Sequence, residues 1–273
     1  MAEYESTIHK DISLYYEDKG VGKPVVLLHG FCGTHAYWKY IMEELSSYYR
    51  VIAIDLRGHG KSAVSEEPFS IDDMAQDIDH LLKQLEIEKA TILGHSLGGY
   101  VTLALAENFP HMVEAFGLIH STGAEDSEDA KKGREKAINR INEEGMKGFI
   151  EELSGRLFAD ENMEEMANEV EFVKKLGFNT RVNGAQGALE AMKNRMNREH
   201  VLKESNCPIL LVAGKGDKII PAEKTFTAQG PHIHHTLMEK SGHMSMIEEP
   251  NELLDAIIGF MGYVDEHRRN NQK

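Results

Sequence analysis

The chain has 273 residues, of which 41% are hydrophobic and 27% charged, a composition typical of a globular protein and not of a disordered or fibrous one. Its formal net charge of −15 argues against a nucleic-acid partner and disfavours strongly anionic substrates, unless a local arginine cluster overrides the global field. No apolar run approaches the roughly 18 residues that cross a bilayer, and the N-terminus lacks signal-peptide features, so we expect no membrane span and a cytoplasmic location. The two cysteines predict no disulfide framework.

Short apolar runs alternate with helical patterns along most of the chain. Residues 4–18 mix polar and apolar residues and are expected to form an antiparallel hairpin. Runs rich in Val, Ile and Leu are typical of strands buried on both faces of a parallel sheet. The expected strands are 23–30, 50–58, 89–94, 114–122, 208–214 and 235–243. Amphipathic helices are expected at 70–87, capped by Ser70, and at 251–264. The alternation predicts an α/β fold with right-handed crossovers.

The segment 124–202 interrupts this alternation, because it is charged, rich in methionine and helical in pattern, with no convincing buried strand. It predicts a helical cap inserted over one end of the sheet; surface helices without a functional role are the alternative. The expected domains are therefore a core of residues 1–122 and 203–273 and a cap of residues 123–202. Methionines on apolar helix faces suit an adaptable substrate pocket, and they also fill gaps in ordinary cores.

The stretch "GHSLGG" at 94–99 contains the candidate nucleophile, Ser96. It follows a strand-like run and precedes an amphipathic helix, which is the context required of a Gly-x-Ser-x-Gly nucleophile elbow. The elbow holds its serine in a strained conformation at the end of the sheet, and the residues two before and two after must be tiny to avoid collision across the turn. His95 is expected to point elsewhere, as a neighbour of the nucleophile.

A serine nucleophile needs a base, and the base needs an orienting carboxylate. His243 in "EKSGHMSMIEEP" lies in a loop after a strand-like run, and Asp217 in "AGKGDKIIP" follows a buried strand. Asp55 is the competing carboxylate, but an organising role in its own loop fits it better. The other histidines considered are expected to hydrogen-bond in their loops or to lie along a strand without binding metal: His29 and His59, and His232, His234 and His235.

Two backbone N–H groups are needed to hold an oxyanion. Leu97, directly after the nucleophile, is the first candidate, and Phe31 in "HGFCG" is the second. Phe31 is also a candidate for lining the acyl pocket. The remaining candidate pocket residues are Cys32, Trp38, His95, Met192 and Met244.

These motifs together resemble the α/β-hydrolase fold superfamily over nearly the whole chain. "HGFCG", "DLRGHGKS", "GHSLGG", "GKGDKIIP" and "SGHMSMIEEP" occur in the order that this family shows, and they look most like single-cap bacterial serine esterases. The resemblance implies a mostly parallel eight-stranded sheet flanked by helices, with a lid inserted after the sixth strand. It also implies a catalytic triad of Ser96, Asp217 and His243 and an oxyanion hole formed by Phe31 and Leu97.

The function expected from this resemblance is hydrolysis of carboxylic esters of small to medium acyl chain by a serine carboxylesterase, with a small-molecule ester as partner and without a metal or organic cofactor. A thioesterase or lactonase differs only in the leaving group. A carbon–carbon hydrolase or lyase-type relative acting on an anionic metabolite needs an arginine aimed into the pocket, for which Arg181 and Arg195 are available. A non-catalytic ligand-binding protein is the alternative from another class. The sequence leaves monomer and homodimer open.

Overall fold

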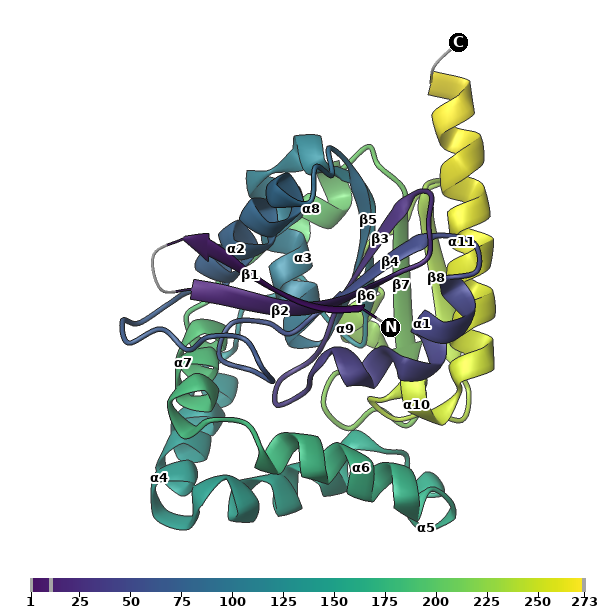
Figure 1. Cartoon of the computed structure of the whole chain (residues 1–273). Coiled ribbons are helices and arrows are strands. Elements are labelled where there is room, and N and C mark those ends of the chain that lie inside the picture. Colours follow the sequence, from purple (N-terminus) through teal and green to yellow (C-terminus); the bar gives the residue numbers. More distant parts are fainter. Residues whose placement is uncertain (1, 10–11, 272–273) are drawn as a thin grey trace.

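The computed structural model describes residues 2–9 and 12–271, and its centre is one eight-stranded sheet (Figure 1). The order across the sheet is β1-β2-β4-β3-β5-β6-β7-β8. The strands are β1 (Ala2–His9), β2 (Ile12–Lys19), β3 (Pro24–Leu28), β4 (Arg50–Ile54), β5 (Ala90–His95), β6 (Val113–Ile119), β7 (Ile209–Gly214) and β8 (Ile233–Met238). β1 and β2 pair antiparallel, β2 and β4 do the same, and every other pairing is parallel. The expected mostly parallel α/β sheet is confirmed.

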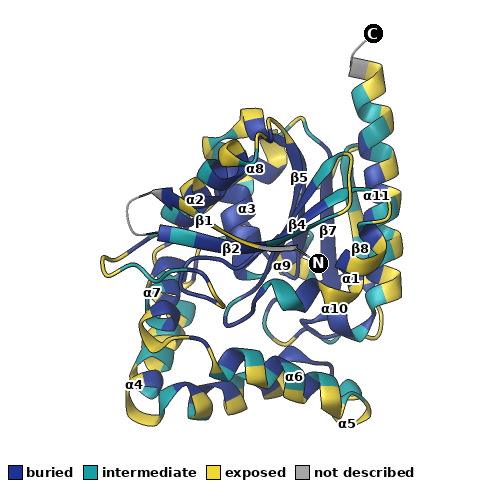
Figure 2. Cartoon of the chain, in the orientation of Figure 1, coloured by how far each residue is buried: buried dark blue, intermediate teal, exposed yellow. Residues whose placement is uncertain are grey.

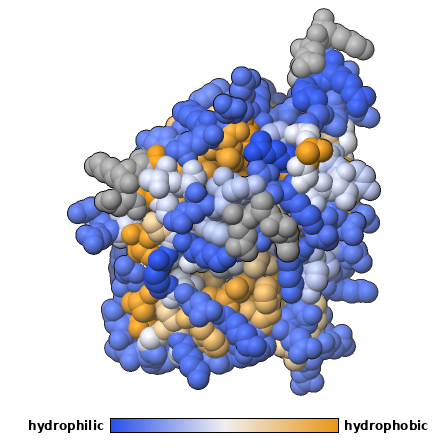
Figure 3. Space-filling view, in the orientation of Figure 1, coloured by the Kyte–Doolittle hydropathy of each residue, from blue (hydrophilic) through white to orange (hydrophobic). Residues whose placement is uncertain are grey.

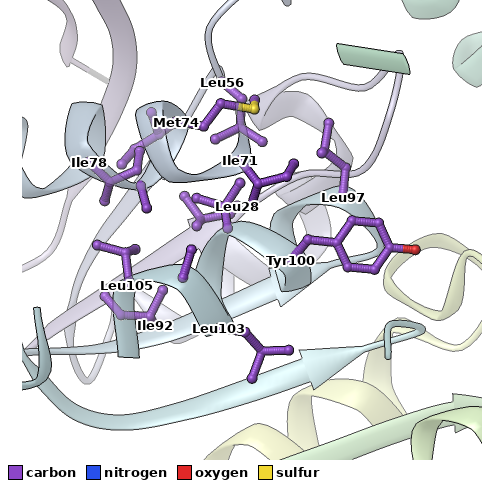
Figure 4. Close-up of a cluster of buried hydrophobic side chains, with 14 of the residues drawn as sticks. Leu28, Leu56, Ile71, Met74, Ile78, Ile92, Leu97, Tyr100, Leu103 and Leu105 are labelled. Carbon is purple, nitrogen blue, oxygen red and sulfur yellow. The ribbon is translucent and has the colours of Figure 1, made fainter. Parts of the chain in front are cut away.

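The central strands are continuously apolar because both faces of the sheet are covered. Val26 and Leu28 of β3 belong to one buried cluster, and Val25 and Leu27 belong to a second one on the opposite face. This follows from the two-residue period of a strand, which sends successive side chains to opposite faces. Figure 4 shows part of the first cluster, where Leu28 and Ile92 of the sheet meet residues of two helices.

Helices cover both faces of the sheet (Figures 1 and 2). α2 and α3 pack on one face, and α1 and α11 pack together on the other. The helices are η1 (His35–Trp38), α1 (Lys39–Leu45), α2 (Ile71–Gln84), α3 (Leu97–Asn108), η2 (Pro110–Met112), α4 (Glu128–Leu157), α5 (Asn162–Glu165), α6 (Ala167–Phe178), α7 (Val182–Lys193), α8 (Glu199–Glu204), α9 (Ala222–Thr225), α10 (Ser245–Glu248) and α11 (Pro250–Asn271). Ser70 caps α2 as predicted, in a reciprocal capping box with Asp73.

The segment between β6 and β7 contains α4 to α8 and, in the described residues, no strand. Figure 1 shows α4 to α7 gathered at one end of the sheet, whereas α8 lies beside α3. α4 is two helical arms joined at Gly145, whose backbone (φ 69°, ψ −176°) is not helical. The positive φ favours glycine at this bend. In Figure 3, a band of apolar residues lies between the sheet and α6 on an otherwise mostly hydrophilic face.

The last strand differs from its prediction. The expected strand 235–243 begins at Ile233 and ends at Met238, so Glu239–His243 form a loop. β8 is an edge strand with several partly exposed side chains, and it therefore lacks the continuous apolar run that marks a buried strand. None of the described helices combines the length and apolar character that a membrane span requires.

Candidate active site

Ser96 lies at a sharp turn between β5 and α3, with φ 50° and ψ −111°. Left-handed backbone is unfavourable for a residue with a side chain, so the turn holds Ser96 under strain. The neighbouring glycines have a steric cause. A Cβ at Gly94 would lie 2.2 Å from the carbonyl oxygen of Gly98, and a Cβ at Gly98 would lie 2.4 Å from that of Leu28. The spacing of "GHSLGG" therefore follows from close approach of strand, turn and helix.

The backbone of this turn is fixed on both sides of Ser96. Its N–H donates to the carbonyl of Ile119 (2.9 Å), and its carbonyl accepts from the hydroxyl of Ser121 (2.8 Å). The Ser96 hydroxyl, in contrast, makes no hydrogen bond within the described part of the chain. It is free to turn towards a neighbouring base, while the backbone that carries it stays in place.

Asp217 and His243 form a buried pair at the ends of β7 and β8. Nδ1 of His243 donates to Oδ2 of Asp217 at 2.7 Å. The other carboxylate oxygen accepts the backbone N–H groups of Ile219 and Ile220, at 2.8 and 2.9 Å. Because Nδ1 carries the donated proton, Nε2 of His243 is the nitrogen left to accept one.

A second imidazole shares this carboxylate, and the sequence reasoning missed it. Nδ1 of His120 donates to the same Oδ2 of Asp217 at 3.1 Å, and its Nε2 accepts from the hydroxyl of Ser245 at 2.8 Å. His120 directly follows β6, so its position at the carboxyl end of a buried strand was the available signal. Its φ of 50° is a second sign of a constrained position.

The charges of this cluster are set by burial and by mutual contact. Burial raises the pKa of Asp217, but His243 and His120 outweigh it and hold that pKa well below its usual range. Burial lowers the pKa of His120 despite the opposing effect of Asp217. Burial, reinforced by the nearby imidazoles of His243 and His120, also keeps the pKa of His95 well below its ordinary value. The carboxylate is therefore ionised, and His95 is neutral.

Ser96 and His243 line the same cavity, which has a volume of about 60 Å³. Of the other expected pocket residues, Phe31, His95, Met192 and Met244 also line it. Further lining residues that the sequence reasoning did not select are Tyr37, Tyr100, Arg134, Leu153, Leu157 and Ile219. Three of these, Arg134, Leu153 and Leu157, belong to α4, where periodicity does not distinguish a pocket-facing residue from a core residue.

Two expected pocket residues, Trp38 and Cys32, are not among the residues that line this cavity. Trp38 is fully buried in the core cluster on the α1 and α11 face of the sheet. Cys32 is buried in the cluster on the opposite face, with φ 58°. Burial raises the pKa of Cys32, so its thiol stays protonated.

Phe31 and Leu97 are the candidates for the two N–H donors of an oxyanion hole. Phe31 follows β3 and lines the cavity, and Leu97 is the first residue of α3, directly after Ser96. Neither backbone N–H has an acceptor within the described residues. Two unpaired donors beside the candidate nucleophile are what an oxyanion hole requires.

The loops after β3 and β4 are held by hydrogen bonds of Asp55, His29 and His59. Asp55 accepts from the backbone N–H of Lys61 in its own loop (2.9 Å) and from that of His35 in η1 (2.7 Å), so it joins two segments. His29 accepts the N–H of Leu56 at 2.9 Å, and His59 lies 3.1 Å from the carbonyl of Arg57. These residues position the loops around the site and do not enter the cavity wall.

Glu248 ties the His243 loop to the helices after β6, another contact that the sequence did not reveal. One carboxylate oxygen accepts from the N–H groups of Gly242 (2.9 Å) and Met244 (3.1 Å). The other accepts from the N–H of Ala159 and the side-chain amide of Asn162, both at 2.8 Å. The N–H of His243 itself donates to the carbonyl of Leu157 at 2.7 Å. The candidate base is thus held between the sheet and the inserted helices.

His120, Asp217 and His243 are also the described residues whose donor atoms gather closely enough to hold a metal ion, within 4.8 Å of one another. Their closeness has another cause, because both imidazoles already donate to Oδ2 of Asp217. A metal at this place would have to displace those protons. The arrangement is that of a hydrogen-bonded charge cluster.

Comparison with known proteins gives the family. A family profile described as the alpha/beta hydrolase fold matches residues 23–250, and the chain belongs to that family. The chain is 28% identical over 260 residues to 3-oxoadipate enol-lactonase 2 of Acinetobacter baylyi, covering 92% of this chain and 94% of that protein. A solved structure of a thermophilic esterase from Thermogutta terrifontis, with malate bound, has a TM-score of 0.91 and 28% identity, covering 97% of this chain and 99% of that one.

A third relative is longer than this chain. It is the dihydrolipoyllysine-residue acetyltransferase component of an acetoin cleaving system from Pseudomonas putida, 30% identical over 250 residues. The match covers 88% of this chain and 64% of that relative, so the chain spans less than two thirds of its length. The family and the esterase and lactonase relatives support hydrolase activity, and they differ among themselves in substrate.

Proposed function

We propose that this chain is a serine hydrolase that cleaves carboxylic esters of short acyl chain through an acyl-enzyme formed on Ser96. The observation that carries the proposal is the cavity that two of these residues share. Ser96, held in a strained turn, lines it together with His243, whose Nδ1 donates to the buried carboxylate of Asp217. Nucleophile, base and orienting acid in this relation are the requirements of acyl transfer.

In the proposed reaction, Nε2 of His243 takes the proton of the Ser96 hydroxyl as its oxygen attacks the ester carbonyl carbon. The N–H groups of Phe31 and Leu97 hold the resulting oxyanion, and Asp217 stabilises the imidazolium. The tetrahedral intermediate collapses, and the alcohol leaves with the proton from His243. Water then attacks the acyl-enzyme by the same steps and releases the acid.

We further propose that residues 123–202 act as the cap of this site. Support comes from the cavity wall, to which α4 and α7 contribute Arg134, Leu153, Leu157 and Met192. A volume of about 60 Å³ is small beside the roughly 300–1,000 Å³ of pockets that hold drug-sized ligands, so the cavity favours short acyl groups. A long acyl chain would require the inserted helices to move.

A lactonase is the second candidate, and the 3-oxoadipate enol-lactonase relative favours it over a thioesterase. Opening a lactone uses the same nucleophile, base and oxyanion donors, and differs only in that the leaving oxygen stays attached to the acyl group. A carbon–carbon hydrolase and a non-catalytic ligand-binding protein remain alternatives that turnover measurements separate from both.

The test compares hydrolysis of p-nitrophenyl acetate, butyrate and octanoate by the wild-type protein, Ser96→Ala and a control, Ser47→Ala, which changes an exposed serine. We expect acetate and butyrate to be cleaved faster than octanoate, and turnover to be lost in Ser96→Ala alone. A fluorophosphonate probe should add to the wild type and to Ser47→Ala, as read by intact-protein mass. Equal turnover by Ser96→Ala, or labelling at another residue, would refute the mechanism.

A further inference from the structure

A single permanently charged side chain lines the cavity that contains Ser96, among the residues that the structure describes. It is Arg134, from the first arm of α4. The other lining residues are aromatic, aliphatic, hydroxyl-bearing or imidazole side chains, and no carboxylate is among those described. A guanidinium group in a small, largely apolar cavity favours an anion there, because charges interact more strongly where water is scarce.

Arg134 is oriented by a buried carboxylate that it shares with a second arginine. Its Nε donates to Oδ2 of Asp126 at 3.1 Å, and Arg195 donates to Oδ1 of the same residue. Burial raises the pKa of Asp126, but Arg134 and Arg195 outweigh it, so the pKa lies below its usual range and the group is ionised. Two guanidinium groups around one carboxylate leave the cluster with one positive charge in excess.

The two arginines have different surroundings. Arg195 is buried, donates to the carbonyls of Met192 (2.9 Å) and Ala124 (2.8 Å), and lies 4.0 Å above the ring of Tyr100. Its role is to brace Asp126. The terminal nitrogens of Arg134 have no acceptor within the described residues, and its side chain is 24% exposed. Arg134 is therefore the member of the cluster that is available to a ligand.

We propose that Arg134 binds a carboxylate group of the substrate, so that the enzyme selects short esters or lactones that carry one negative charge. This inference rests on the proposed function, since Ser96 of the same cavity is the nucleophile. The terminal N–H groups of a guanidinium match the two oxygens of a carboxylate. One excess charge suits a monoanion, and the net charge of −15 disfavours more highly charged substrates.

The test compares matched pairs of esters in which a carboxylate replaces an alkyl end, followed by acid release in a pH-stat. Methyl hydrogen succinate is paired with methyl butanoate for the acyl side, and acetoxyacetate with propyl acetate for the alcohol side. The variants are Arg134→Gln, Arg134→Lys and the control Arg156→Gln, which removes an exposed charge from the same helix outside the cavity. Thermal unfolding followed by circular dichroism checks that each variant is folded.

We expect Arg134→Gln to lower kcat/KM by about tenfold to a hundredfold for the charged ester of at least one pair, as expected for loss of a charge-assisted hydrogen bond. The neutral esters should change by less than about twofold, Arg134→Lys should recover part of the loss, and Arg156→Gln should match the wild type. Equal losses on charged and neutral esters, or no loss on either, would overturn the inference.

Binding of butyrate, a monoanion, and of butyramide, its neutral counterpart, by calorimetry separates this inference from the proposed function. If the wild type binds butyrate and Arg134→Gln does not, the anion site stands even where no ester is hydrolysed, and only the proposed function fails. If neutral esters are cleaved at Ser96 while butyrate binds no better than butyramide and charged esters are not preferred, the proposed function stands and the anion site is refuted.

Discussion

Replacing Asp217 by asparagine is the most direct test of the hydrogen-bonded cluster of Asp217, His120 and His243, because all four groups around the carboxylate are donors. Oδ1 accepts two backbone N–H groups, from Ile219 and Ile220, and Oδ2 accepts Nδ1 of His243 and of His120. An asparagine side chain keeps one acceptor oxygen and gains an NH₂ donor. Whichever way the amide turns, its NH₂ meets groups that were donating to the carboxylate.

The orientation that preserves the turn places the amide oxygen towards the two backbone N–H groups. The NH₂ group then faces His243, which must present an unprotonated Nδ1 and carry its proton on Nε2. That tautomer cannot take the proton of Ser96. We expect kcat to fall about 10⁴-fold, as loss of the correct tautomer does in a serine protease, with little change in KM. That factor corresponds to about 5.5 kcal/mol of lost transition-state stabilisation.

The assay is steady-state hydrolysis of p-nitrophenyl acetate, with Asp160→Asn as a control. Asp160 carries an exposed carboxylate near this loop, paired with Lys218 rather than with an imidazole. The control should retain wild-type kcat, and both variants should show a cooperative thermal transition. A loss of less than about tenfold in folded Asp217→Asn would show that Asp217 does not set the tautomer of the base.

Two further predictions concern the support of the site and acid stability. Glu248→Gln places an NH₂ group against backbone N–H donors, so the free energy of unfolding measured in urea should fall by about 1–3 kcal/mol. The matched Glu239→Gln changes an exposed carboxylate and should leave that free energy unchanged. Burial, foremost, lowers the pKa of His29 to about 3 and of His59 to about 4. In the unfolded chain both imidazoles bind a proton below about pH 6.5, whereas in the folded protein they stay neutral. Each histidine should therefore lower the free energy of unfolding by about 1.4 kcal/mol per pH unit as the pH falls from about 6 towards 4. Equal unfolding free energies at pH 7 and pH 5 would contradict this.

The positions of the candidate triad could be predicted because each depends on local backbone constraints. Ser96 needs tiny neighbours at fixed spacing, and Asp217 and His243 follow strand-like runs through glycine-containing turns. Parallel strands bring their carboxyl ends to one edge, so residues distant in sequence meet there. His120 obeys the same rule at the end of β6, but no glycine pattern marks it, and its role depends on the carboxylate that another strand end delivers.

The cavity wall could not be predicted in the same way, because it is made by packing between separate helices. Arg134 lies on a charged helix, where its spacing resembles that of a solvated residue. Nothing in that spacing reveals its hydrogen bond to Asp126 or its place in the cavity wall. Trp38 and Cys32 show the converse. Both lie close in sequence to Phe31, a candidate oxyanion donor, yet both are buried in the hydrophobic clusters.

This difference separates the residues proposed for chemistry from those proposed for substrate choice. Ser96, His120, Asp217 and His243 follow β5, β6, β7 and β8, which are neighbours in that order across the sheet. Arg134 comes from a helix inserted between two of these strands, and Glu248 and the Leu157 carbonyl join the insertion to the His243 loop. Changes confined to the cavity face of the inserted helices should therefore alter which esters are cleaved, whereas changes at the Glu248 contact should impair every ester alike.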